Sequence, residues 1–198
     1  MKVFGIGLSK TGTTSLAEAL RVLGFATVDS PHDSQSREEI LAMLAANGGS
    51  GAGRLSVLDR FDAATDLPIA ANYRALDRGY PGSRFVLTVR EKGQWLASCE
   101  RWWPERIMPF YDHPENWFTQ YLEALCSAVF GTTDYDADLF SAAYDSHLEG
   151  VLEHFRSRSD ELLVLDVSSD DAWAQLSEFL DRPAPRDTPF PHANAFPR

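Results

Sequence analysis

The sequence predicts an α/β fold in which helices flank a central, mostly parallel sheet, giving three layers. Short apolar runs rich in β-branched and aromatic residues alternate with segments whose apolar residues recur at helical spacing. That alternation is typical of parallel strands joined by helices. The chain has 198 residues, the length of one domain, and no linker divides it. We therefore expect a single domain over residues 1–198.

The first strand and helix are the best defined pair. Residues 3–8 form a short apolar run bounded by glycines, which indicates a buried strand. A helix is predicted over 13–23 because Leu16, Leu20 and Leu23 recur on one face, and Gly24 has the position of a C-terminal cap. A strand, a tight loop and a helix are the opening of a βαβ unit.

The remaining elements follow from the same two patterns. Apolar runs predict further strands over 55–58, 63–67, 85–89 and 162–167. Helical spacing predicts helices over 36–46, 69–78, 92–103, 116–129, 139–155 and 172–180, the first of them begun by a capping box at Ser36. Coil is predicted for the loop NGGSGAG (47–53), for 104–114 and for the tail 183–198, which contains five prolines.

The net charge of −11 excludes some classes of partner. Proteins that bind nucleic acid or anionic membranes need a basic face, so we expect neither partner. A small basic pocket for one anion remains compatible with this charge. The sequence leaves the oligomeric state open.

The cysteines and the N-terminus predict a cytoplasmic protein. Cys99 and Cys126 are too far apart for a CxxC motif, and we expect both to remain reduced thiols. The apolar run at the N-terminus is broken by Lys10, so it is too short for a signal peptide. No stretch reaches the roughly 18 apolar residues that a membrane span requires.

The most informative segment runs from Gly7 to Ser15, between the first strand and the first helix. Gly7 and Gly12 have the separation of the glycines in a phosphate-binding P-loop, whose backbone N–H groups and helix N-terminus converge on a phosphate. The lysine that should follow the second glycine is replaced by Thr13, and Lys10 lies inside the loop instead. No acidic residue follows the strand 85–89, because Arg90 comes next. Both departures argue against ATP hydrolysis.

This loop resembles that of the PAPS-dependent sulfotransferases, where PAPS is 3′-phosphoadenosine-5′-phosphosulfate. The family's 5′-phosphosulfate loop, Lys-Ser/Thr-Gly-Thr-Thr/Ser, is matched without a gap by residues 10–14. The resemblance implies a P-loop-like fold and a donor site that needs no metal. The loop residues it assigns to donor binding are Ser9, Lys10, Thr11, Gly12, Thr13, Thr14 and Ser15. A glycine turn with a surface lysine is the alternative.

A second match lies around the strand 85–89. In the family, an arginine at the end of this strand and a serine eight residues later hold the 3′-phosphate of the donor, and Arg90 and Ser98 reproduce that spacing. A guanidinium binds phosphate in a bidentate manner and a hydroxyl adds a neutral donor. The alternatives are a salt bridge of Arg90 with Glu91 or Asp59, and a surface position on the helix for Ser98.

The third match supplies a candidate base. Cytosolic sulfotransferases have a Lys-Thr-His-Leu-Pro segment whose histidine is the base, and this chain has Asp66 in place of the histidine and Ala64 in place of the lysine. The resemblance makes Lys10 and Asp66 the catalytic pair, with Asp66 taking the acceptor's proton. Alternatively, Asp66 is an N-cap or turn residue before Pro68.

The resemblance extends over nearly the full length, to a small sulfotransferase group of bacteria, fungi and simple animals. It implies transfer of a sulfuryl group from PAPS to a hydroxyl or amine of a small-molecule acceptor, with release of PAP. Two alternatives stay open: a P-loop kinase or other NTP-binding enzyme, and a catalytically silent PAP-binding protein.

Two further segments complete the comparison with the family. The family's Arg-Lys-Gly segment, which closes over the 3′-phosphate, is absent, and Pro189–Asn194 takes its place. His192, within Pro189–Asn194, is expected to be packed or solvated.

An aromatic-rich segment either covers an apolar or aromatic acceptor or packs the helical layer. Its members are Trp102, Trp103, Phe110, Tyr111, Trp117, Phe118 and Tyr121.

Overall fold

The computed structural model describes residues 1–46 and 53–193, which divide into two compact units. The first unit comprises residues 1–89 and 155–198, and the second comprises 90–154. Each unit is described by itself. The predicted loop over 47–53 lies almost entirely outside the described residues, as does Asn194. That the chain forms a single domain stays a prediction.

The first unit is built on a parallel sheet, as the sequence predicts. Within the described residues it has five strands in the order β2-β3-β1-β4-β5, all parallel. They are β1 (Val3–Gly5), β2 (Thr27–Asp29), β3 (Ala63–Thr65), β4 (Arg84–Val89) and β5 (Leu162–Asp166). The α/β fold class is therefore confirmed. Because β1 is central, its carboxyl end lies between those of β3 and β4.

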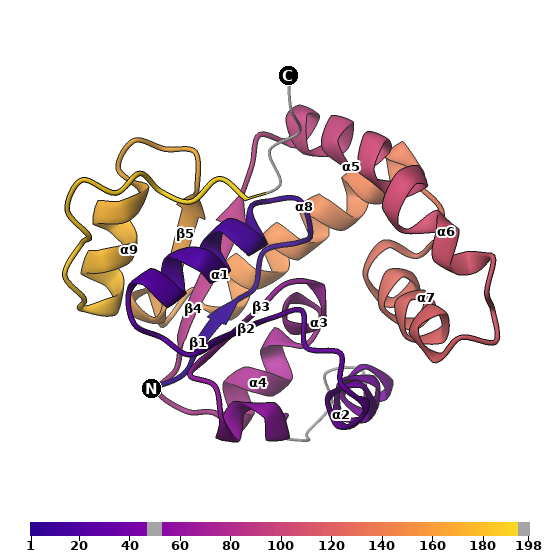
Figure 1. Cartoon of the computed structure of the whole chain (residues 1–198), viewed down its shortest axis with the longest axis horizontal. Coiled ribbons are helices and arrows are strands. Elements are labelled where there is room, and N and C mark those ends of the chain that lie inside the picture. Colours follow the sequence, from indigo (N-terminus) through magenta and orange to yellow (C-terminus); the bar gives the residue numbers. More distant parts are fainter. Residues whose placement is uncertain (47–52, 194–198) are drawn as a thin grey trace. The chain divides into compact units, whose positions relative to one another are not determined.

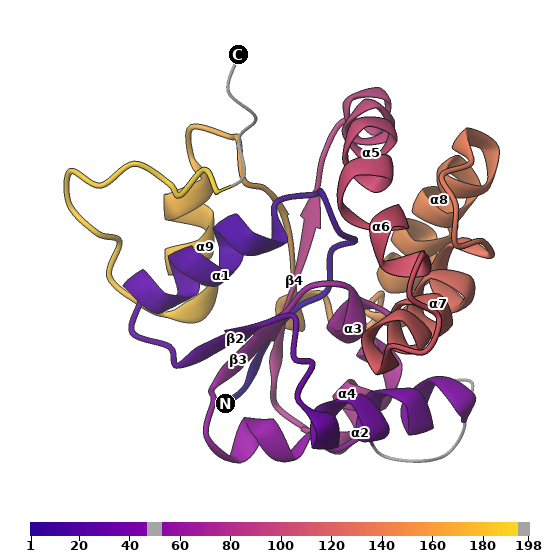
Figure 2. The ribbon, with the colours of Figure 1, turned by 45° about the vertical axis from the view of Figure 1, so that its right-hand side comes forward.

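Helices cover both faces of this sheet (Figures 1 and 2). One face carries α1 (Thr13–Val22) and α9 (Ala172–Leu180), and the other carries α3 (Leu67–Ala70) and α4 (Tyr73–Gly79). The unit also contains α2 (Ser34–Ala45) and the 3-10 turns η1 (Ser56–Asp59) and η2 (Ser159–Glu161). The three-layer arrangement follows from strands whose side chains alternate between the two faces.

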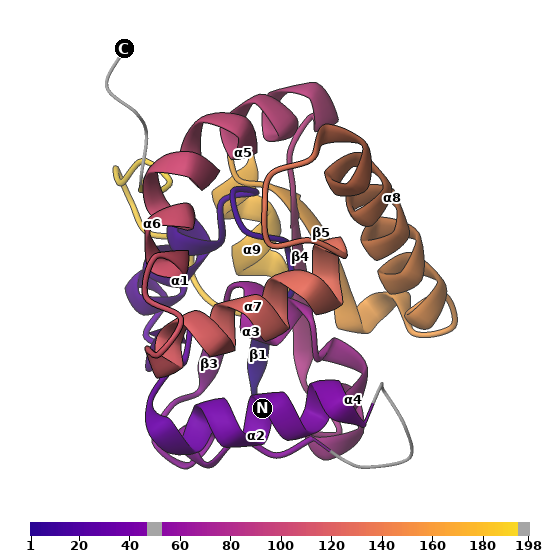
Figure 3. The same cartoon turned by 90° about the vertical axis from the view of Figure 1, so that its right-hand side faces the viewer.

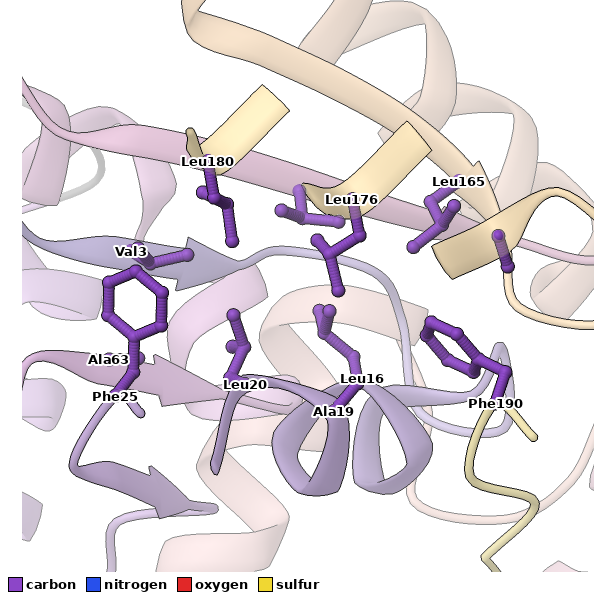
Figure 4. Packing of buried hydrophobic residues seen from close by; sticks show 12 residues of the cluster. Val3, Leu16, Ala19, Leu20, Phe25, Ala63, Leu165, Leu176, Leu180 and Phe190 are labelled. Carbon is purple, nitrogen blue, oxygen red and sulfur yellow. The ribbon is translucent and has the colours of Figure 1, made fainter. Parts of the chain in front are cut away.

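Val3 and Phe4 show this alternation. Val3 belongs to a buried cluster between the sheet and α1 and α9, in which Leu16 and Leu20 meet Leu176 (Figure 4). Phe4 points to the opposite face, where its ring lies 5.3 Å from that of Phe85. Burial of such side chains on both faces explains the near-continuous apolar strands.

The second unit is helical (Figure 3). Its helices within the described residues are α5 (Lys92–Arg106), α6 (Met108–Tyr111), α7 (Trp117–Phe130) and α8 (Ala137–His154). Its core is aromatic, because the Phe130 and Phe140 rings stack at 4.3 Å and Trp103 meets Phe140 edge-on at 4.8 Å.

Several predicted elements were wrong in detail. The strand expected over 55–58 is the 3-10 turn η1, and the helix expected over 69–78 is divided into α3 and α4. Asp33, not Ser36, caps α2, because its side chain accepts a hydrogen bond from the Ser36 N–H. Residues 104–114 are largely helical rather than irregular: α5 continues through Pro104 and α6 follows.

Candidate functional site

The predicted anion loop is held to the sheet by hydroxyl groups. Thr11 donates its hydroxyl to the Leu8 carbonyl at 2.7 Å, and the same oxygen lies 2.7 Å from Thr88 Oγ1 on β4. A Cβ at Gly7 would collide with both the Thr88 and the Thr11 side chains, so only glycine permits this close approach. The loop is therefore a fixed structure and not a loose glycine turn.

Backbone conformation brings the loop into the first turn of α1. Gly12 is the N-cap of α1 with φ of 105°, a left-handed conformation that glycine adopts readily. Lys10 also has a positive φ, 72°, which is uncommon for a residue with a side chain. Such strained positions concentrate at ligand-binding sites. The N–H groups that open a helix have no intrahelical partner and can face an anion.

Asp66 lies beside this loop, at the end of β3. Its Oδ1 accepts hydrogen bonds from the hydroxyls of Ser9, at 3.0 Å, and Thr13, at 3.3 Å. Asp66 occupies the N-cap position of α3, but its side chain makes no capping hydrogen bond. Asp66 therefore does have the N-cap position that the alternative predicts, but its carboxylate is directed to the loop and does not cap the helix.

The electrostatic surroundings of Asp66 favour its protonated form. The Asp66 carboxyl is partly removed from water, which raises its pKa. The negative charge of Asp29 raises this pKa further. The hydrogen bonds from Ser9 and Thr13 act in the opposite direction and do not cancel this increase. Asp29 ends β2, in register with Thr65, whose hydroxyl donates to Asp29 Oδ1 at 2.6 Å.

The Thr13–Asp66 contact puts an acidic residue beside the loop. In the sequence, the strand 85–89 is followed by Arg90 and not by an acidic residue. The structure places one after β3 instead, hydrogen bonded to the first residue of α1. In P-loop NTPases, Mg²⁺ is held by a carboxylate and by the hydroxyl two residues after the second glycine, which is Thr14 in this chain, whereas Thr13 stands at the position of the lysine. Among residues 1–46 and 53–193, no group of three or more His, Cys, Asp or Glu side chains could hold a metal ion.

The other loop residues differ in exposure. Thr11, Thr13 and Ser15 are buried, whereas Lys10 and Thr14 are half-buried. Ser15, in the first turn of α1, accepts a hydrogen bond from the backbone N–H of Ala193 at 3.1 Å. The C-terminal tail thus reaches the predicted donor loop, a contact that the sequence did not indicate.

Arg90 and Ser98 belong to the second unit. Arg90 directly follows β4, and its backbone is held by the Tyr144 hydroxyl, which donates to the Arg90 carbonyl at 2.6 Å. The alternative ionic partners are engaged elsewhere: the Glu91 carboxylate caps α5, and Asp59 pairs with Arg54. Ser98 is only 3% exposed on α5, so it is not a surface serine. Their contact with a 3′-phosphate stays a prediction.

The aromatic-rich segment of the second unit serves more than one purpose. Trp103 and Tyr121 are buried, and Trp103 donates its indole N–H to the Thr133 carbonyl at 2.7 Å. Phe110 and Trp117, in contrast, are 38% and 45% exposed. The segment therefore packs the helical core with some of its members and presents others at its surface.

Sequence reasoning missed Asp29 and Thr88 as residues that shape the site. Thr88 lies within a correctly predicted strand, but nothing in its sequence position marks its hydroxyl as a partner of Thr11. Asp29 ends β2, a strand of three residues that the apolar pattern did not predict.

No helix in residues 1–46 or 53–193 combines the length and apolar character that a membrane crossing requires.

Comparison with known proteins matches residues 2–196 to the family described as "Sulfotransferase domain". The chain is also similar to a protein of Aspergillus versicolor named Ava biosynthesis cluster protein M. The two are 25% identical over 213 residues, which cover 97% of this chain and 80% of that protein. Since the family match covers nearly the whole chain and includes both the loop and Asp66, the chain belongs to the sulfotransferase domain family.

Proposed function

We propose that the chain transfers a sulfuryl group from PAPS to a hydroxyl or amine of a small-molecule acceptor and releases PAP. The observation that carries this proposal is the contact of Asp66 with Ser9 and Thr13. It places a candidate base within hydrogen-bond reach of a loop suited to a phosphosulfate. Family membership supplies the reaction class.

The residues of the loop fit the donor's anionic end. The first turn of α1 supplies backbone N–H groups, and Lys10 supplies a positive charge within the loop. We assign Ser9 to Ser15 to donor binding, and Arg90 and Ser98 to its 3′-phosphate. When bound, PAPS supplies the sulfuryl group and the PAP leaving group.

The catalytic roles follow from charge. As the bond between sulfur and the bridging oxygen breaks, negative charge grows on that oxygen, and Lys10 with the loop N–H groups stabilises it. The acceptor oxygen or nitrogen forms the new bond to sulfur and gives its proton to Asp66. Because Ser9 and Thr13 both donate to Oδ1, we assign the proton to Oδ2. The raised pKa of Asp66 makes it a stronger base than an ordinary aspartate.

The acceptor is expected to be a neutral or cationic small molecule. The net charge of −11 disfavours polyanionic acceptors, and the exposed rings of Phe110 and Trp117 suit an apolar or aromatic one. The similar Aspergillus protein is named for a biosynthesis cluster, which supports an acceptor made by biosynthesis.

The test is transfer of labelled sulfate from PAPS over a panel of phenols, alcohols and amines. We expect labelled product with at least one acceptor, formed about 10²–10³-fold more slowly by Lys10→Ala. PAP binding without transfer to any acceptor would instead identify a silent PAP-binding protein.

One observation favours a second function, a kinase or other NTP-binding enzyme. Asp66 supplies a carboxylate beside the loop, as P-loop NTPases do for Mg²⁺, although its partner Thr13 stands at the position of their lysine and the Mg²⁺-binding hydroxyl would be that of Thr14. The missing lysine after Gly12 weighs against it. Phosphate transfer from Mg-ATP, measured with the same acceptors, separates the two functions.

A further inference from the structure

The C-terminal segment Thr188–Ala193, which we call the strap, returns to the start of α1. The Trp173 indole donates to the Thr188 carbonyl at 2.9 Å. Phe190 is buried in the same cluster as Leu16 of α1 (Figure 4). Its ring lies 4.8 Å from that of Trp173. Beyond this anchor, the Ala193 N–H donates to Ser15 Oγ. The strap is thus attached at its beginning, middle and end.

The end of the strap meets a part of α1 that lacks a local cap. The N-cap of α1 is Gly12, which has no side chain to accept a hydrogen bond from the first turn. Contacts from outside the helix restrain this turn instead: Thr13 donates to Asp66, and Ser15 accepts from Ala193. The turn they restrain is the one whose N–H groups face the predicted anion.

The sequence of the strap also limits the conformations that it can adopt. Pro189 and Pro191 flank Phe190, and each fixes its own φ, so fewer conformations compete with the docked one. Ser15 is only 3% exposed, so its hydroxyl has little water as an alternative partner. The hydrogen bond from Ala193 therefore contributes to the position of this turn.

We propose that the strap is a positioning element of the donor site, which holds the first turn of α1 in its anion-binding conformation through Ser15. The proposal rests on the proposed function, because it assigns the loop to the donor. Coupling is reciprocal: if the docked strap favours donor binding, the bound donor favours the docked strap by the same factor.

The first test is a double-mutant cycle on one hydrogen bond. Ser15→Ala removes the acceptor and Ala193→Pro removes the donating N–H. The Kd of PAP is measured by calorimetry for the wild type, both single variants and the double variant. We expect Ala193→Pro to raise Kd about tenfold, which is about 1.4 kcal/mol, and Ser15→Ala to raise it at least as much, because Ser15 is also assigned to donor binding. The double change should raise Kd no further than Ser15→Ala alone, since the hydrogen bond that Ala193→Pro removes is already lost in that variant.

Trp173→Phe is the matched control. It removes a hydrogen bond to the strap at Thr188, far along the chain from Ser15, and keeps an aromatic ring against Phe190. We expect its Kd for PAP to stay within about twofold of wild type. In turnover, the Ser15 and Ala193 changes should raise the KM for PAPS and leave kcat at saturating donor nearly unchanged, a split that general loss of structure would not give.

The second test uses the unaltered chain. Saturating PAP should slow hydrogen exchange of the Ala193 amide, which donates to Ser15, about tenfold, as reciprocity requires. Unchanged exchange, or wild-type affinity in Ala193→Pro, would overturn the role of the strap while leaving the proposed function intact. Failure of the wild type itself to bind PAP would overturn the proposed function, and the strap's role with it.

Discussion

The two compact units hold their site residues in different ways. In the first unit, the polar side chains bind one another: Ser9 and Thr13 donate to Asp66, and Thr11 pairs with Thr88. In the second unit, the backbone of Arg90 is held by Tyr144, and Ser98 is buried on α5. We propose different roles for particular residues of each unit: Lys10 and Asp66 of the first act in the bond change, and Arg90 and Ser98 of the second bind the donor's 3′-phosphate. Changes at Lys10 and Asp66 should therefore lower kcat, and a change at Arg90 should raise Kd.

The largest effect is expected from Asp66→Asn. Asparagine keeps an oxygen that accepts from Ser9 and Thr13 but has no basic carboxylate, so kcat should fall by about 10²–10⁴-fold. The Kd of PAP, measured by calorimetry, should change little. A kcat within tenfold of wild type would show that another group takes the proton.

The second largest loss of kcat is expected from Lys10→Ala. Loss of a donor that stabilises the growing charge costs about 3–4 kcal/mol of barrier, or about 10²–10³-fold in kcat. The fold should persist, because Lys10 is half-buried and lies outside the core cluster. Labelled transfer measures the loss, and circular dichroism melting checks the fold. Normal turnover in this variant would refute the assignment of the loop.

Arg90→Ala tests the second unit. Hydrogen bonds from a charged group contribute about 1.5–3 kcal/mol, so the Kd of PAP should rise about 10–100-fold, with a smaller effect on kcat at saturating donor. Arg54→Ala is the matched control, since it removes an exposed arginine paired with Asp59. If Arg90→Ala lowered kcat and left Kd unchanged, the proposed difference between these residues of the two units would be wrong.

Asp29→Asn should give the smallest effect, visible in the pH profile. The negative charge of Asp29 raises the pKa of Asp66, so its removal should lower that pKa. Since the base acts in its ionised form, the acidic limb of kcat/KM should move to lower pH. Asparagine retains an acceptor for Thr65. A limb that moves to higher pH, or stays in place, would show that Asp66 is not the titrating base.

Local pattern predicted the strands that are apolar throughout, and it failed where tertiary packing decides. β4 and β5 were predicted correctly because parallel strands that are buried on both faces give continuous apolar runs. Residues 55–58 have the same apolar character but form a 3-10 turn, which periodicity does not distinguish over so few residues. α5 continues through Pro104 because the adjacent Trp103 is buried against Phe130 and Phe140.

In the candidate site, too, local sequence pattern predicted only the residues that are adjacent in the chain. Glycine spacing and the resemblance to the sulfotransferase motif together predicted the loop from Ser9 to Ser15, because such a loop has its residues in one continuous segment. The groups that shape the site around that loop come from distant parts of the sequence: Thr88 of β4 contacts Thr11, Ala193 of the tail contacts Ser15, and Asp29 of β2 raises the pKa of Asp66. No sequence signal short of the fold itself brings these groups to one edge of the sheet.

The central claim is that the loop binds the phosphate end of PAPS without a metal. Calorimetric titration of the wild-type chain in the presence of EDTA tests it most directly, with PAP as ligand, followed by titration with Mg-ATP in magnesium buffer. We predict one PAP bound per chain without metal, and no heat from Mg-ATP. Saturable binding of Mg-ATP, with none of PAP, would contradict the claim.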